Sequence, residues 1–357
     1  MGGTNLNLTD YGWNPGKLPP DAAQNGHIPA RITAVHKERY ALVCEYGEGF
    51  GRLKTGVYYY GAEPFPTTGD FVLLQYNPGG DAAIVKTLPR TTYFSRLDPS
   101  SSGHAEQAVA ANFDYVLLLQ SLNRDFNPKR LERYVTLAWQ SGATPVVVLT
   151  KADLAEDYGA LVRAAEGIAP GIAVHAVSAV SGEGLDALSP YLRAGKTLVL
   201  LGSSGVGKSS LVNALAGELC METGEIREDD SRGRHTTTHR QLIMLKNGVM
   251  IIDTPGMREL GMWDVRAGLG EAFGDVEQYF GQCRFTDCKH QNEPGCAVKA
   301  AIEHGELSAE RWSSYLRLKR EAKYSDDRGA YLRERQQWHK TIAGQRRQIN
   351  QNRGDAT

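Results

Sequence analysis

The segment at residues 202–209, Gly-Ser-Ser-Gly-Val-Gly-Lys-Ser, constrains the fold of this chain more than any other part of the sequence. It fits the pattern G-x-x-x-x-G-K-[ST] of a loop that binds nucleotide phosphates. The apolar run Thr197–Leu201 before it predicts a buried strand, and residues 210–215 after it predict a helix. Glycines let backbone N–H groups turn toward phosphate oxygens at the start of such a helix. The alternative, a glycine turn before an ordinary helix, fits this context less well.

Residues 202–209, called the phosphate loop below, carry two side chains with expected chemistry. Lys208 should reach the β- and γ-phosphates, and the Ser209 hydroxyl should ligate Mg²⁺. The predicted nucleotide contacts here are Gly202, Ser203, Ser204, Gly205, Val206, Gly207, Lys208, Ser209 and Ser210.

The composition limits the class of protein. A chain of 357 residues has room for two or three domains, and a formal net charge of −1 gives no overall basic signal for nucleic acid. Five cysteines, three of them close together, argue against a disulfide framework. With no visible secretory signal and no apolar run near the ~20 residues of a membrane span, we expect a cytoplasmic protein.

The N-terminal third predicts a tail and a barrel. Residues 1–28 are polar and rich in Gly, Asn and Pro, which predicts a flexible tail. Residues 29–100 contain five short β-rich runs, which predict an OB-like β-barrel domain. Such barrels often bind RNA, and Tyr58–Tyr60 could stack on bases, although alternation of core and surface positions is enough to explain them and is the favoured interpretation. The expected strands are Arg31–Val35, Tyr40–Glu45, Gly56–Tyr60, Asp70–Gln75 and Ala82–Lys86.

Strands and helices alternate through the middle of the chain, which predicts a parallel, doubly wound α/β sheet. Ligands of such sheets bind at the carboxyl ends of the strands, where all the motifs of this region fall. The expected strands are Tyr115–Leu119, Pro145–Leu149, Ala173–Val177, Thr197–Leu201, Gln241–Lys246 and Val249–Ile252, with helices at about 129–140 and at Leu185–Leu192.

The segment Thr150-Lys151-Ala152-Asp153 resembles the N-K-x-D motif with which GTPases read guanine. The Asp153 carboxylate can accept hydrogen bonds from guanine N1–H and from the 2-amine, whereas adenine lacks that amine. The stem of Lys151 would cover one face of the base. Thr150 replaces the usual Asn, which leaves open how the contact of that Asn is made.

The pair Ser178-Ala179 resembles the S-A-K element, in which a backbone N–H meets the guanine O6, with Val180 at the usual Lys position. The segment Asp253-Thr254-Pro255-Gly256 matches D-x-x-G after a strand. Asp253 would hold Mg²⁺ through water, and the Gly256 N–H would sense the γ-phosphate.

The order of these motifs is unusual. The base-reading elements precede the phosphate loop, whereas ordinary GTPases have them after D-x-x-G. Permutation preserves packing when the old termini lie close together, so residues 101–273 predict a circularly permuted P-loop GTPase domain.

Cys283-x4-Cys288-x-His290-x5-Cys296 supplies three thiolates and one imidazole, which suit one tetrahedral Zn²⁺ per chain. The alternative is free cysteines beside a solvent-exposed histidine. We expect a mostly helical zinc-binding domain over residues 274–330. The basic tail, 331–357, reads equally as an RNA-binding arm or as a solvated tail.

This combination of barrel, permuted GTPase and C-x4-C-x-H-x5-C segment resembles the bacterial RsgA (YjeQ) family over about residues 30–325. The resemblance implies a multidomain GTPase that acts late in maturation of the small (30S) ribosomal subunit, binds the subunit and its rRNA, and is stimulated by it. We expect a monomer with no membrane or DNA partner. The further matching segments are Gly69–Val72, Leu88–Thr91, Gly205–Ser210, Arg234–Thr238 and Gly256–Leu260.

The expected catalytic residues are Lys208, His235 and Thr237. Met257 stands where many GTPases carry a water-orienting Gln, so hydrolysis should be slow in the free enzyme. His235 is expected to position water once the ribosome orders its loop, unless it is simply an exposed histidine. By resemblance, Thr237 is expected to sense Mg²⁺ and the γ-phosphate.

Two other functions compete with a GTP-hydrolysing assembly factor that binds the subunit with GTP and leaves after hydrolysis. An ATP-dependent enzyme is disfavoured by Asp153. An RNA-binding scaffold with a regulatory nucleotide site and little turnover is disfavoured because Lys208, Ser209 and Asp253 are all present.

Overall fold

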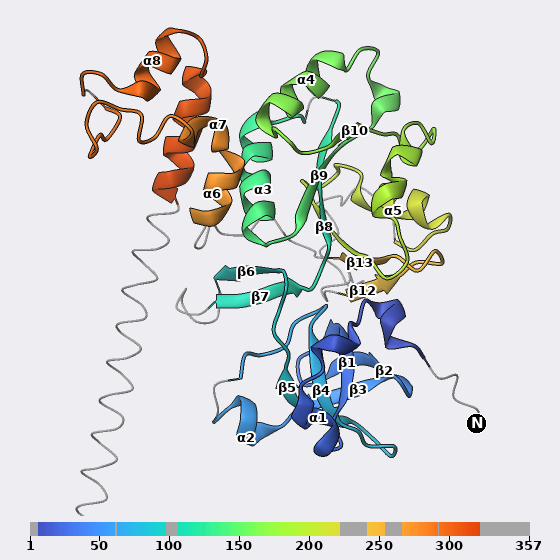
Figure 1. The fold of residues 1–357 in the computed structure, drawn as a ribbon. Coiled ribbons are helices and arrows are strands. Elements are labelled where there is room, and N and C mark those ends of the chain that lie inside the picture. Colours follow the sequence, from blue (N-terminus) through green and yellow to red (C-terminus); the bar gives the residue numbers. More distant parts are fainter. Residues whose placement is uncertain are drawn as a thin grey trace, which may run out of the picture. The chain divides into compact units, whose positions relative to one another are not determined.

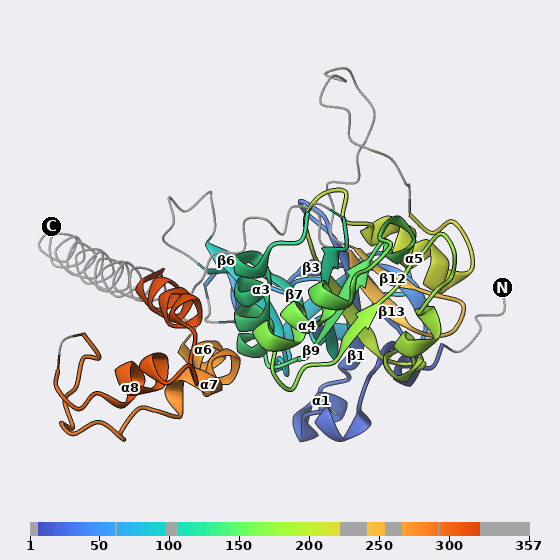
Figure 2. The same cartoon turned by 90° about the horizontal axis from the view of Figure 1, so that it is seen from above.

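The computed structural model describes seven stretches of the chain (Figures 1 and 2), namely residues 6–60, 63–97, 106–123, 125–221, 241–253, 266–291 and 293–321. The chain forms two compact units. The first comprises Met1–Ser95 with Ala108–Leu260, and the second comprises Arg96–Gln107 with Gly261–Thr357. Within the described stretches, no helix is long and apolar enough to cross a membrane.

The first unit begins with a closed five-stranded barrel. Its strand order is β1-β2-β3-β5-β4, and pairing of β1 with β4 closes the ring. The pairing of β3 with β5 is parallel, whereas the other neighbours are antiparallel. The OB-like barrel predicted from the sequence is therefore confirmed. The strands are β1 (Ile28–Val35), β2 (Tyr40–Cys44), β3 (Gly47–Leu53), β4 (Phe71–Gln75) and β5 (Ala82–Thr87).

The third barrel strand differs from the prediction. Gly56–Tyr60 is not a strand, because Thr55–Tyr58 form the short helix α2 and bury Tyr58, whose hydroxyl lies 3.0 Å from Thr87 Oγ1. The third strand is the glycine-rich β3 instead. A Cβ on Gly51 would lie 2.8 Å from Leu42 Cδ2 and 3.0 Å from Ile84 Cγ1, so a larger residue there would push these core side chains aside.

The N-terminal segment packs on the outside of the barrel. It forms two short 3₁₀ turns, η1 (Leu8–Tyr11) and η2 (Pro15–Lys17), and the helix α1 (Pro20–Gln24). Leu8 and Trp13 are buried against the barrel, with the Trp13 ring 5.1 Å from that of Phe71. The prediction of a flexible tail over residues 1–28 is wrong for the described residues 6–28, because these few apolar side chains have a hydrophobic surface to cover.

The second part of this unit is an α/β domain. Its strands follow the order β10-β9-β8-β11-β13-β12, all parallel except β12. The strands are β8 (Tyr115–Ser121), β9 (Thr144–Thr150), β10 (Val174–Ala176), β11 (Thr197–Leu201), β12 (Gln241–Met244) and β13 (Met250–Asp253), and the helices are α3 (Pro128–Gln140), η4 (Ala152–Leu154), α4 (Gly159–Ile168), η5 (Leu185–Tyr191) and α5 (Lys208–Ala216).

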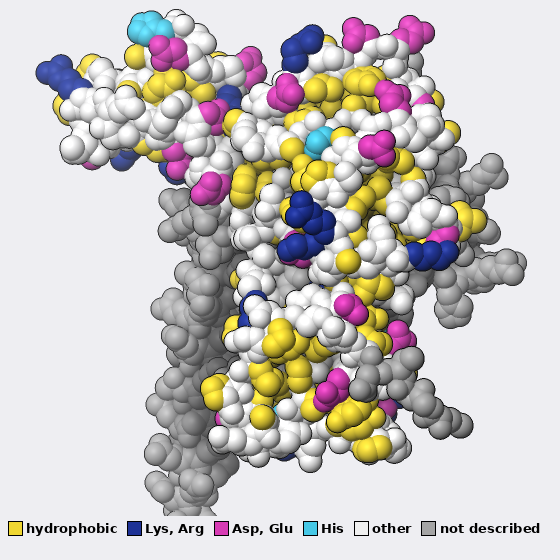
Figure 3. All heavy atoms as spheres, turned by 45° about the vertical axis from the view of Figure 1, so that its right-hand side comes forward, with side chains coloured by type: hydrophobic (Ala, Val, Ile, Leu, Met, Phe, Trp, Pro, Cys, Tyr) yellow, Lys and Arg dark blue, Asp and Glu magenta, His cyan; other side chains and the backbone are white. Residues whose placement is uncertain are grey.

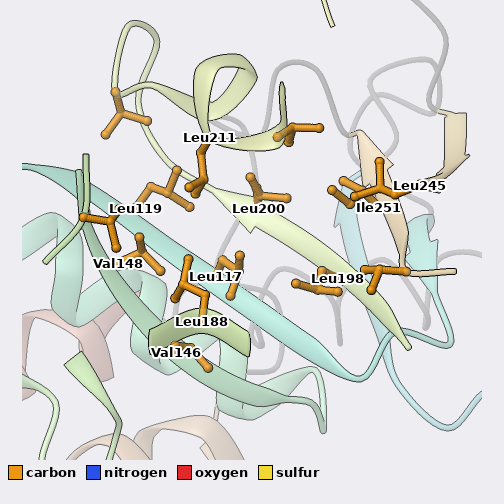
Figure 4. Close-up of a cluster of buried hydrophobic side chains, with 14 residues drawn as sticks. Leu117, Leu119, Val146, Val148, Leu188, Leu198, Leu200, Leu211, Leu245 and Ile251 are labelled. Atoms are coloured by element: carbon orange, nitrogen blue, oxygen red, sulfur yellow. The ribbon is translucent and has the colours of Figure 1, made fainter. Parts of the chain in front are cut away.

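Sheet and helices bury a common apolar core (Figure 4). Leu117, Leu119, Leu198 and Leu200 come from adjacent strands and pack with Leu211 of α5. Strands covered on both faces require nearly continuous apolar runs, which is why the sequence predicted them well. The strand β11 lies between β8, which precedes it in the chain, and β13, which follows it. The strands before the predicted base-reading motifs, β9 and β10, thus precede the strand of the phosphate loop in the chain, as the permuted domain requires.

One buried cation links the barrel to the α/β domain. Arg31 of β1 is 1% exposed and donates to the carbonyl oxygens of Tyr11 at 2.5 Å, Gly69 at 3.3 Å and Asn112 at 2.7 Å. Its guanidinium also lies 3.2 Å from Met250 Sδ on β13. A backbone pairing between Ala34 of β1 and Gln241 of β12 adds a second link.

Two further elements escaped sequence reasoning. The strands β6 (Tyr93–Leu97) and β7 (Glu106–Ala111) form a separate two-stranded sheet. On the face shown in Figure 3, basic and acidic side chains are interspersed.

The second unit is mostly helical, as predicted. It contains α6 (Arg266–Ala272), α7 (Gly274–Glu277), α8 (Ala297–Glu303) and a further helix at 309–321. Arg311 of the last helix donates to both carboxylate oxygens of Asp275 at 2.9 Å and to the carbonyl oxygen of Ala272. This paired, nearly buried guanidinium fixes the helix against α6 and α7.

Candidate functional site

The phosphate loop connects β11 to α5 in the strand–loop–helix context that its motif requires. Gly205 and Gly207 have φ angles of 72° and 102°, in the left-handed region that favours glycine. A Cβ on Gly202 would lie 2.8 Å from Val206 Cγ1 and 3.0 Å from Leu119 Cβ. The loop is thus wound tightly against β8 in a form that only these glycines allow.

Lys208 begins α5 and folds back over the loop. Its Nζ donates to the carbonyl oxygens of Gly202 at 2.8 Å and Ser203 at 2.7 Å. Asp253 ends β13 on the neighbouring strand; burial raises the pKa of its carboxyl group, and the positive charge of Lys208 partly offsets that rise. A cation and a carboxylate therefore share the carboxyl edge of the sheet with the half-buried Ser209.

The two predicted base-reading motifs meet at the same edge. Ser178 Oγ donates to Asp153 Oδ1 at 2.5 Å, and the N–H groups of Val180 and Ser181 donate to Ser178 Oγ at 3.2 and 3.1 Å. Ser178 thus orients the exposed Asp153 carboxylate and also holds the turn that follows Ala179. Lys151 adopts a φ of 63°, a strained conformation for a residue with a Cβ. This conformation sets the direction of the turn between β9 and η4.

Thr150 joins the base-reading motif to the phosphate loop. Its hydroxyl donates to the carbonyl oxygen of Val206 at 2.6 Å, and Gln120 O lies 3.3 Å away. Thr150 therefore links the two motifs directly. A hydroxyl has a single proton, so Thr150 has no second donor to offer a ligand.

Asp125 belongs to no sequence motif and was not predicted as a site residue. It lies in the loop after β8, and its carboxylate accepts a hydrogen bond from Ser203 Oγ at 2.7 Å. The contact spans 78 residues, so no local pattern could indicate it.

The four predicted zinc ligands come together in the second unit. The ligand atoms of Cys283, Cys288, His290 and Cys296 all lie within 4.8 Å of one another. His290 Nδ1 is 3.4 Å from Cys283 Sγ and 3.5 Å from Cys296 Sγ. Three soft thiolates and an imidazole, converging at this distance, fit one tetrahedral Zn²⁺.

The surroundings favour the ligand form of these side chains. The His290 ring stacks on Phe280 with centroids 4.6 Å apart, and the edge of Trp312 lies against it. Burial and the positive charge of Lys319 lower the pKa of His290, which keeps the imidazole neutral. The N–H of Ala297 donates to Cys283 Sγ at 3.3 Å, which stabilises a thiolate there.

Some predicted site residues lie outside the described stretches. They are His235, Thr237 and Gly256, together with Met257.

Comparison with known proteins agrees with this arrangement. Residues 87–263 match the family model described as RsgA GTPase. The protein named small ribosomal subunit biogenesis GTPase RsgA 2 from Listeria monocytogenes serotype 4b (strain F2365) is 48% identical over 321 residues, which cover 89% of this chain and 90% of the relative.

Two crystal structures share the fold. YjeQ from Thermotoga maritima has a TM-score of 0.61 and 26% identity, covering 82% of this chain and 97% of that one. YloQ, described as a circularly permuted GTPase, has a TM-score of 0.58 and 24% identity, covering 85% and 96%.

Proposed function

The chain belongs to the RsgA GTPase family, and from this premise we propose that it hydrolyses GTP to GDP and phosphate as a factor in maturation of the small ribosomal subunit. The observation that carries the proposal is the meeting of three motifs at the carboxyl edge of the sheet. Asp153 supplies a guanine-reading carboxylate, Lys208 a phosphate-binding cation, and Asp253 a carboxylate beside that cation.

In this proposal the base is read at the Asp153 end of the edge. The carboxylate oxygen that does not accept from Ser178 remains available to guanine N1–H and the 2-amine. The backbone N–H groups after Ser178 face guanine O6, and the Lys151 stem covers the ring. Binding ATP would leave this carboxylate facing an acceptor, which costs affinity.

The phosphates are bound by the loop and by Lys208, which exchanges its bonds to the Gly202 and Ser203 carbonyl oxygens for phosphate oxygens. Gly256 N–H senses the γ-phosphate. Ser209, Thr237 and Asp253 would hold Mg²⁺, which when bound neutralises charge on the phosphates.

Hydrolysis is slow in the free enzyme because Met257 cannot orient water. Binding of the small subunit brings His235 to the place from which it positions the attacking water. The subunit therefore selects the GTP state, stimulates turnover and releases the protein as GDP forms. We place this cycle in the cytoplasm, with a monomer that contacts the subunit and its rRNA.

The test is GTP turnover by purified protein with and without purified small subunits, with ATP as the competing substrate. We expect slow turnover alone, strong stimulation by subunits and little use of ATP. Co-sedimentation with subunits should be stronger with a non-hydrolysable GTP analogue than with GDP. Turnover that stays negligible even with subunits would favour the scaffold function, and equal co-sedimentation in both nucleotide states would exclude the switch.

The substitution His235→Ala separates stimulation from binding. It should remove most of the stimulation and leave nucleotide affinity nearly unchanged. His304→Ala, at the exposed end of α8, is the control and should be stimulated normally. Full stimulation of His235→Ala would rule out a catalytic role for this histidine.

A further inference from the structure

The loop between β8 and α3 brings a carboxylate to the phosphate loop. Ser203, the second residue of the phosphate loop, is 9% exposed and donates its hydroxyl proton to Asp125 Oδ2 at 2.7 Å. The carbonyl oxygen of Ser203 is one of the two that Lys208 contacts. Asp125 therefore fixes Ser203 by a hydrogen bond, and Ser203 in turn contacts the phosphate-binding Lys208.

The position of Asp125 is built by its own loop. Arg130 of α3 donates to Asp125 Oδ1 at 3.3 Å and Oδ2 at 3.0 Å, and also to the Asp125 carbonyl oxygen. The same guanidinium donates to Gln120 Oε1 of β8 at 3.0 Å. Asn123 Oδ1 accepts from Asp125 N at 3.2 Å. The carboxylate is thus fixed from both flanking elements before the phosphate loop is considered.

Arg130 also neutralises most of the negative charge that Asp125 would otherwise place beside the phosphates. A bare carboxylate beside a phosphate site would repel the nucleotide, but an Arg–carboxylate pair presents an acceptor with little net charge. Ser203 therefore donates a strong hydrogen bond to this carboxylate, and no full negative charge stands beside the phosphates.

A second link lies on the other side of the loop. Thr150 holds the carbonyl oxygen of Val206, so the two links bracket the exposed Ser204 and Gly205. We propose that Asp125 is a positioning residue for nucleotide binding: with Thr150 it fixes the phosphate loop on both sides of Ser204-Gly205, so that their N–H groups are pre-set for phosphate oxygens. A loop ordered in advance loses less conformational freedom on binding. This inference rests on the proposed nucleotide site.

Titration with a fluorescent GDP analogue, and steady-state GTP turnover, test the proposal on the full chain. Asp125→Ala and Ser203→Ala should each raise the Kd about 10- to 150-fold, the range expected for loss of one charge-assisted hydrogen bond. The double variant should be no weaker than the weaker single variant, because both substitutions remove the same bond. KM for GTP should rise while kcat stays within about twofold, since ground-state and transition-state binding are affected alike.

Two further variants separate positioning from general stability. Asp125→Asn keeps an acceptor oxygen for Ser203 and should restore the Kd to within about threefold of wild type. Lys196→Met breaks the 2.7 Å pair with Asp114, which joins β8 and β11 at their amino ends instead of their carboxyl ends. It should lower the melting temperature without changing the Kd.

The outcomes are distinguishable. If the wild-type chain bound no guanine nucleotide, the proposed function itself would fail. If wild type binds and Asp125→Ala binds equally well, or if the two single effects multiply in the double variant, the positioning role is wrong and the proposed function stands.

Discussion

The substitution Arg31→Met tests whether one buried guanidinium holds the N-terminal segment, the barrel and the α/β domain together. Methionine has a similar unbranched length and fills the space of the arginine stem. It removes the donors to the carbonyl oxygens of Tyr11, Gly69 and Asn112, and the cation 4.9 Å from the Phe71 ring centroid. Burial lowers the pKa of Arg31 to about 10, so the group that is lost is a cation at neutral pH.

The expected magnitude follows from opposing contributions. Three hydrogen bonds from a charged donor contribute about 1.5–3 kcal/mol each. Removing the buried charge also removes its desolvation penalty of several kcal/mol, which offsets roughly half of the stabilisation lost with the three hydrogen bonds. Gly69 O also keeps a donor, since Asn112 Nδ2 lies 3.3 Å from it. The expected net loss is about 3 kcal/mol, which for a unit of this size is a fall in melting temperature of roughly 6–12 °C.

Urea unfolding and thermal unfolding measure this loss. Limited proteolysis adds a local readout, because freeing Tyr11 O should expose residues 6–28 to cleavage before the rest of the chain. The control is Arg52→Met on β3, whose exposed head group pairs with Asp81 at 2.7 Å and should contribute far less. A loss below about 1 kcal/mol for Arg31→Met, or cleavage of the N-terminal segment at the wild-type rate, would refute the role of Arg31 as a junction.

Three other predictions follow from the sites. Asp153→Asn should weaken binding of GDP and favour xanthine nucleotides, because the amide can donate to the xanthine 2-oxo group; equal protection of the wild-type chain by ATP and GTP in a thermal-shift titration would contradict the assignment. The purified chain should contain about one zinc by elemental analysis, and Cys288→Ser should loosen the second unit while GDP still binds; freshly purified protein without zinc would exclude the site. Burial lowers the pKa of His175, whose Nε2 lies 3.0 Å from the Tyr191 hydroxyl. The imidazole therefore binds a proton more readily in the unfolded chain than in the folded one, so the free energy of unfolding should fall as pH drops through 6.5 and below. His175→Gln should flatten that fall in a series of urea-unfolding measurements at different pH values.

The parts of the fold that the sequence predicted share a physical cause. Strands buried on both faces need continuous apolar runs, so β8, β9 and β11 appear in the sequence within one or two residues of their bounds. The helix α3 is equally clear, because Asn127 caps it by accepting from Arg130 N, and Pro128 opens it. These features depend on residues close together in the sequence, so they can be identified without knowing the tertiary contacts.

The mistakes have the opposite cause. The glycines of β3 lower its strand propensity, and the close approach of Leu42 and Ile84 accounts for one of them, Gly51. The tyrosines at 58–60 favour a strand by propensity, but Thr55–Tyr58 form a helix that buries the Tyr58 ring. Leu8 and Trp13 looked like isolated apolar residues in a polar tail until the barrel surface was known. Each depends on contacts far away in the sequence.

The candidate site was predictable despite the permuted order of its motifs. Each motif follows a strand directly, and parallel strands place their carboxyl ends at one edge whatever their order in the chain. The links between the motifs are set by the same adjacency: β9 and β11 flank β8, so Thr150 reaches Val206 across the sheet edge, and the loop after β8 reaches Ser203. Motif patterns identify residues that would touch the nucleotide. They cannot identify Asp125, which acts on the loop and not on the ligand, and whose partner is chosen by strand order alone.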